Sequence, residues 1–170
     1  MFAPILNWVM GGSRVPRLEE PGPAPSDGLE KEWVQELLLA VPRRRGILAE
    51  IEDLLIGLPK RERYDLVTRT ALRFALYVVD LPASERDHDA GPFGLLDHSL
   101  GVARAAVGEL VRPSFRASED PAENYREQPI WAYSGFVLGL LHDAGKVFDL
   151  EVVPKAGGPA WNPLEGPLAA

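Results

Sequence analysis

Apolar side chains recur every three or four residues along most of this chain, a spacing that puts them on one face of an α-helix. The recurrence is found in residues 29–41, 42–57, 59–78 and 95–111. Residues 131–147 are nearly all apolar or small, which predicts a helix buried on most sides. No segment alternates apolar and polar residues well enough to predict a sheet, although residues 148–153 could pair as a short strand. The spacing therefore predicts an all-α fold, a helical bundle of about five to six helices.

Glycine and proline mark the borders of the helical part. Residues 1–28 end in a Gly- and Pro-rich stretch without periodicity, which predicts a flexible N-terminal leader. Residues 112–130 are polar and contain three prolines, so we expect a loop there, with a short helix as the alternative. The helical domain is expected over residues 29–153, and an irregular Pro/Gly-rich tail over residues 154–170.

Composition excludes several classes of protein. The sequence contains no cysteine, which rules out a disulfide framework, a zinc ribbon, an iron–sulfur cluster and a thiol nucleophile. The longest apolar run is far shorter than the roughly 20 residues of a membrane span, and the first ten residues make a poor secretory signal. We therefore expect a cytoplasmic protein without a membrane span.

The net charge of −7 is unevenly distributed along the chain. Residues 1–76 carry equal numbers of basic and acidic side chains, so the whole acidic excess lies in residues 77–170. An acidic half argues against a large nucleic-acid footprint on that surface. It is compatible with carboxylates gathered near a cation.

His142 and Asp143 stand next to each other near the end of the apolar segment 131–147. Successive residues of a helix point about 100° apart, so such neighbours converge on one ion only at a helix end or bend. Gly145 provides a place for such an end. The alternative interpretation is a half-exposed pair that caps a turn, because the His-Asp dipeptide alone is a weak motif.

His98, early in the segment 95–111, adds a second imidazole from another predicted helix. Alone it would most often be a core or boundary residue. Together with His142 and Asp143 it makes the imidazole and carboxylate mixture that suits a transition metal such as Mn, Fe or Zn. Lys146 could hold a phosphate oxygen nearby, or could simply be a favourable cation at a helix C-terminus.

Three stretches of sequence around these residues resemble a known family. They read VVDLPASERDHDAGPFGLLDHSLGVARAA, GLLHDAGKVFDLEVV and WNPLEG, in this order, and extend roughly from residue 79 to residue 166. The chain resembles the N-terminal TraI-type region of MobH-family conjugative relaxases, which has an HD domain. More broadly, it resembles the HD metal-dependent phosphohydrolases.

This resemblance implies an HD-domain-like helical bundle with a metal held by His98, His142 and Asp143. It implies metal-dependent cleavage of a phosphodiester in DNA at a transfer origin, with DNA and other conjugation proteins as partners. Within that chemistry Asp143 and Lys146 would be catalytic, and His88 would shuttle a proton. The family's usual histidine cluster would fall on residues 87–89, of which only His88 is a histidine.

Two features depart from the family pattern. Asp87 and Asp89 flank His88, and they form either a solvated acidic loop or oxygen ligands for a hard cation. After Lys146 the chain has three acidic side chains and no histidine, so the usual distal ligand is not recognisable. We therefore expect a domain that is incomplete at its C-terminal end, in the N-terminal portion of a longer protein.

Basic side chains in the first half of the chain form the surface on which DNA could bind. We expect possible DNA contacts from Arg43, Arg44 and Arg45. The other basic residues of this surface are Lys60, Arg61, Arg63, Arg69 and Arg73. The alternative is ordinary solvated helix faces. Two rival functions stay open: a phosphohydrolase acting on nucleotides or cyclic dinucleotides, and a non-catalytic interaction module of a DNA transfer apparatus.

Overall fold

The computed structural model describes residues 36–78, 81–84, 91–112, 118–153 and 158–166. Its helices are α3 (Pro42–Leu54), α4 (Lys60–Leu66), α5 (Thr68–Val78), α6 (Gly94–Leu110), α7 (Pro121–Leu141) and the short 3-10 helix η2 (Ala144–Phe148). No strand occurs in these residues, so the predicted all-α fold is confirmed for the described part of the chain. The predicted leader, residues 1–28, lies outside it.

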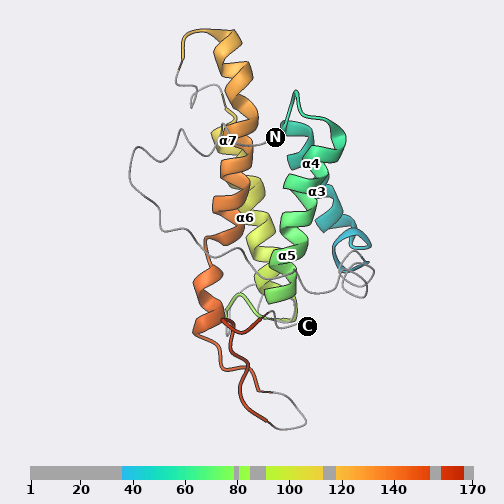
Figure 1. The fold of residues 1–170 in the computed structure, drawn as a ribbon, viewed down its shortest axis with the longest axis vertical. Coiled ribbons are helices and arrows are strands. Elements are labelled where there is room, and N and C mark those ends of the chain that lie inside the picture. Colours follow the sequence, from blue (N-terminus) through green and yellow to red (C-terminus); the bar gives the residue numbers. More distant parts are fainter. Residues whose placement is uncertain (1–35, 79–80, 85–90, 113–117, 154–157, 167–170) are drawn as a thin grey trace.

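Helices α6 and α7 lie side by side, and α3, α4 and α5 form the rest of the bundle (Figure 1). Their shared core is made of aliphatic side chains and two phenylalanines that are almost fully buried. It includes Ile51 of α3, Val78 of α5, Leu96 and Leu100 of α6, and Phe136 of α7. The apolar faces predicted for residues 42–57 and 95–111 are therefore the ones that are buried.

The long helix expected over residues 59–78 is two helices in the structure. Helix α4 ends at Leu66, and α5 begins at Thr68. Val67 between them is fully buried, and the Thr68 hydroxyl donates a 2.6 Å hydrogen bond to the Glu52 carboxylate of α3. The distortion therefore falls where the chain is tied to α3.

The prediction of a loop over residues 112–130 is wrong for residues 121–130, which form the first half of α7. Asp120 caps this helix by accepting a 2.9 Å hydrogen bond from the Ala122 amide, and Pro121 occupies the first turn, where no N–H donor is needed. Helix α7 then continues through Pro129. Two of the three prolines that indicated a loop, Pro121 and Pro129, therefore mark a helix start and a tolerated interior position, and Pro113 lies outside the described residues.

The segment 131–147 was expected to be buried on most sides, which is also wrong. Phe136 and Leu140 are buried, but Leu138 is 68% exposed and Leu141 is 46% exposed. Helix α7 ends at Leu141, and the strand considered for residues 148–153 does not form. Among the described helices, none has both the length and the apolar character required to span a membrane.

Candidate metal centre

The side chains of His98, His142 and Asp143 converge on one point. His98 Nε2 and His142 Nε2 are 3.2 Å apart, and each lies close to Asp143 Oδ2, at 3.4 and 3.2 Å respectively. The three atoms thus form a nearly equilateral triangle. All three side chains are partly exposed, between 24% and 31%, so the triangle is open to solvent.

This spacing fits a bound transition metal. Nitrogen and oxygen ligands about 2.1 Å from an ion, at octahedral or tetrahedral angles, are about 3.0–3.4 Å from one another. The observed separations of 3.2–3.4 Å lie in that range without any movement of the side chains. Three protein ligands also leave coordination positions for water or a substrate, as in catalytic zinc sites.

The break between α7 and η2 explains how two neighbouring residues reach the same point. His142 is the C-cap of α7 and keeps helical dihedral angles, whereas Asp143 leaves the helical region at φ −108° and ψ 13°. The chain turns at Asp143, two residues before Gly145. Buried Val147 anchors η2 on the core, so the turn is held by packing.

The proton on His142 is assigned by its hydrogen bond to the backbone. His142 Nδ1 lies 2.8 Å from the Gly139 carbonyl oxygen, which can only accept, so Nδ1 carries the hydrogen. Nε2 of the neutral ring then has its lone pair directed at the centre. Histidine ligands of metals have this arrangement, because the second nitrogen fixes the tautomer and the ring orientation.

Lys146 lies beside the carboxylate of the triangle. Its ammonium donates hydrogen bonds to Asp143 Oδ2 at 2.7 Å and to the Ala83 carbonyl oxygen at 2.8 Å. The hydrogen bond from Lys146 is the largest cause that holds the pKa of Asp143 below its ordinary value of 3.8. Partial burial acts in the opposite direction, and the charges of His142, Lys146 and His98 lower the pKa further.

Replacing Lys146 with methionine should raise the pKa of Asp143 in the metal-free protein. A carboxyl group whose pKa is lowered by folding stabilises the fold above its unfolded pKa, and this stabilisation is lost as the pH falls through the folded value. Lys146→Met should therefore cost roughly 1 kcal/mol at neutral pH, and less at about pH 3. Urea unfolding at both pH values measures this, and an undiminished cost at about pH 3 would contradict the ion pair.

The remaining predicted site residues are distributed as follows. His88 lies outside the described residues, but the Lys146 bond to Ala83 puts residues 81–84, which precede it, next to the centre. Arg43 and Arg45 are exposed at the start of α3. Arg44 is not available for the predicted DNA contact, because its side chain is buried and both edges of its guanidinium bind protein oxygens.

Two features of this region were not predicted from the sequence. Asp97, next to His98, is the partner of Arg44, at 2.7 Å between Arg44 Nε and Asp97 Oδ1. Gly135 and Gly139 let α7 approach α6, because a Cβ atom at Gly139 would lie 2.8 Å from the Ala103 amide nitrogen. The spacing of four between these glycines, on a predicted helix, was the available signal.

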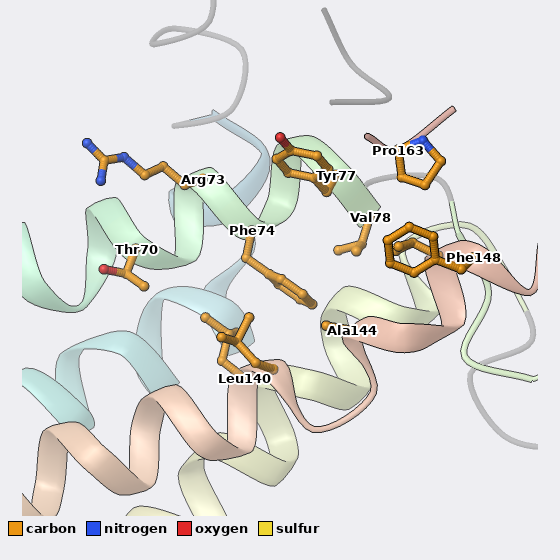
Figure 2. A pocket seen from close by; sticks show the side chains of 11 residues that line it. Thr70, Arg73, Phe74, Tyr77, Val78, Leu140, Ala144, Phe148 and Pro163 are labelled. Carbon is orange, nitrogen blue, oxygen red and sulfur yellow. The ribbon is translucent and has the colours of Figure 1, made fainter. Parts of the chain in front are cut away.

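A separate pocket of about 380 Å³ lies between α5 and the end of the α7–η2 segment (Figure 2). It is lined mainly by apolar side chains, among them Phe74, Tyr77, Leu140 and Phe148. Among the described residues that line it, there is no histidine or carboxylate. It is therefore distinct from the triangle of candidate ligands.

Comparison with known proteins identifies the family of the chain. No curated protein and no solved structure gives a significant match to the chain. One family model, TraI_2, described as "Putative helicase", matches residues 28–170. The sequence contains no Gly-x-x-x-x-Gly-Lys-Ser/Thr loop of the kind that binds nucleoside triphosphates in P-loop enzymes. Because the match covers most of the sequence, the chain belongs to the TraI_2 family, a family of TraI-type conjugal-transfer proteins.

Proposed function

We propose that His98, His142 and Asp143 bind a divalent transition metal, Mn, Fe or Zn, in an HD-type domain of a MobH-like relaxase. The domain would cleave a phosphodiester of DNA at a transfer origin. The observation that carries this proposal is the triangle of two imidazole nitrogens and one carboxylate oxygen, with sides of 3.2–3.4 Å. The TraI-type family supplies the context of DNA transfer.

The residues around the triangle have roles that follow from their chemistry. A bound metal of this kind supplies a Lewis acid and lowers the pKa of a coordinated water. The Gly139 carbonyl keeps His142 in the tautomer that can ligate, and Asp143 contributes the negative charge. Lys146 is 38% exposed, so its ammonium can meet a phosphate oxygen while it stays near Asp143.

His88 is the proposed proton shuttle. It follows Ser84 by four positions, and the Lys146–Ala83 hydrogen bond ties the preceding residues to the centre. A histidine titrates near neutral pH, which suits it to give a proton to a leaving oxygen. Its role is separable from metal binding, since His88→Ala should lower cleavage and leave the affinity for metal unchanged.

DNA would reach the centre along the start of α3. Arg43 and Arg45 are exposed there, and Arg44 between them reaches Asp97, the neighbour of His98. The two exposed arginines therefore lie at the same end of the bundle as the centre. Their guanidinium groups can contact phosphates without reading the base sequence.

Replacing Arg43 and Arg45 with alanine should weaken DNA binding equally for all sequences. Each lost phosphate contact should lower the salt dependence of log Kd by about one unit. Fluorescence anisotropy with a labelled oligonucleotide at several salt concentrations measures this slope. Lys60→Ala with Arg61→Ala removes the same charge from the start of α4, at the other end of α3 in Figure 1, and should change the slope less. Equal slopes for the two double variants would refute this DNA path.

Nicking of a supercoiled plasmid tests the function itself. With Mn²⁺, the protein should convert a plasmid that carries its transfer origin to the open circle, and His142→Ala should abolish this. Turnover of small phosphodiesters without any nicking would support the nucleotide phosphohydrolase instead. Stoichiometric metal binding without either activity would support the non-catalytic module.

A further inference from the structure

Arg44 and Asp97 form an ion pair at the junction of α3 and α6, in which Arg44 is buried and Asp97 is 26% exposed. Arg44 Nε donates to Asp97 Oδ1 at 2.7 Å, and Arg44 Nη2 donates to Asp97 Oδ2 at 2.8 Å, so the two groups meet in a bidentate fork. Arg44 Nη1 also donates to the Leu37 carbonyl oxygen at 3.0 Å. Only 5% of Arg44 is exposed. A bidentate pair with a buried guanidinium has one geometry, unlike a solvated surface pair.

The same guanidinium also contacts the residue that begins α6. Its carbon atom lies 5.1 Å from the centroid of the Phe93 ring. Phe93 is the N-cap of α6 and has φ of 64°, a left-handed conformation that is unfavourable for a side chain of this size. Arg44 therefore contacts both the strained cap of α6 and, through Asp97, its first turn.

His98 follows Asp97 directly, and it is the one residue of the triangle that α6 contributes. The other two come from the α7–η2 junction. A rotation of the first turn of α6 would swing the His98 ring away from His142 and Asp143. The fork at Asp97 resists that rotation, because adjacent residues of one helical turn move together.

We infer that Arg44 is a positioning residue for the metal centre, which it serves by holding Asp97 and so aiming His98 at His142 and Asp143. This inference rests on the proposed function, since it gives Arg44 a part in assembling the same centre. Arg44 is a buried residue of α3 that does not reach the ligands, yet it would affect their geometry.

If the ion pair had only a structural role, its removal would have a different effect on metal binding. Removal of one partner leaves an unpaired charge that is buried (Arg44) or partly buried (Asp97), which destabilises the fold. Removal of both, in Arg44→Met with Asp97→Leu, replaces the pair by apolar groups of similar size and should restore the thermal midpoint toward that of the wild-type protein. If the pair serves stability alone, metal binding should return together with the midpoint.

Titration of the metal-free protein with Co²⁺, followed by visible absorption and by thermal unfolding, separates these two roles. The Arg44→Met/Asp97→Leu variant should bind Co²⁺ roughly 10- to 100-fold more weakly than the wild-type protein even where its midpoint is restored. Wild-type affinity in this variant would overturn the positioning role alone. A wild-type protein that does not bind Co²⁺ would overturn the proposed centre and the positioning role with it.

The chain provides a matched control in a second ion pair between the same helices. Arg104 of α6 and Glu50 of α3 lie 2.6 Å apart, but both side chains are more than half exposed. Arg104 follows His98 by six positions on α6. Arg104→Met with Glu50→Leu should leave the Co²⁺ affinity unchanged. An equal loss in this control would assign the effect to looser packing of α3 on α6, and would overturn the inference.

A measurement on the metal-free protein covers the case in which the double variant does not fold. Arg44→Lys keeps the charge but cannot form the fork. The rings of His98 and His142 have centroids 5.1 Å apart, so the wild-type protein should show a nuclear Overhauser effect between them. That effect should weaken in a folded Arg44→Lys variant, and an unchanged effect would overturn the positioning role.

Discussion

Replacing His142 with alanine should lower the affinity of the protein for Mn²⁺ by at least about 100-fold, because the variant loses one of three ligands. Its backbone should remain folded, since the His142 side chain is 31% exposed and follows the last residue of α7. Isothermal titration with Mn²⁺ measures the affinity, and far-ultraviolet circular dichroism verifies the helix content.

Asp149→Ala is the matched control for this prediction. Asp149 is an exposed carboxylate directly after η2, close in sequence to the centre but outside the triangle. Its removal should leave the affinity for Mn²⁺ within about twofold of the wild-type value, since it supplies no ligand. An unchanged Mn²⁺ affinity in His142→Ala, or an equal loss in Asp149→Ala, would mean that the metal binds elsewhere.

Gly139→Ala should strongly destabilise the packing of α6 on α7. The added Cβ would meet the Cα atom of Ala103 and would lie 2.8 Å from the Ala103 nitrogen, both of them backbone atoms that a rotamer change cannot move. The two helices would have to separate, at a cost of about 3 kcal/mol or more. That is a large part of the total stability of about 5–15 kcal/mol of a typical domain. Urea unfolding measures it.

Gly101→Ala provides the comparison within α6. A Cβ atom at Gly101 would have no neighbour within 4 Å, so this variant should be more stable than the wild-type protein by about 0.5–1 kcal/mol. Both substitutions add the same methyl group to a helical glycine. Similar stabilities of Gly101→Ala and Gly139→Ala would show that α6 and α7 are not in close contact at Gly139.

Helix positions were predictable where the apolar pattern was regular, as in α3 and α6, because periodicity is a local property of the sequence. The first half of α7 was not, because Pro121 and Pro129 carry the same local signal in a loop and in a helix. The exposure of Leu138 was not predictable either. An apolar stretch reveals that a helix is hydrophobic, but not how many neighbours cover it.

The centre was predictable in part. His98 and the His142–Asp143 pair were expected to come together, and the structure places their ligand atoms within 4.8 Å of one another. The burial of Arg44 was not predictable, since three consecutive arginines look alike in the sequence and only the packing of α3 on α6 buries one of them. Metal binding itself stays a prediction.

Anomalous diffraction from crystals grown with Mn²⁺ or Zn²⁺, recorded at the absorption edge of the metal, tests the central claim most directly. One peak is expected about 2.1 Å from His98 Nε2, from His142 Nε2 and from Asp143 Oδ2. This peak should disappear in crystals of His142→Ala. A metal bound at other residues, or a triangle without an anomalous peak at saturating metal, would contradict it.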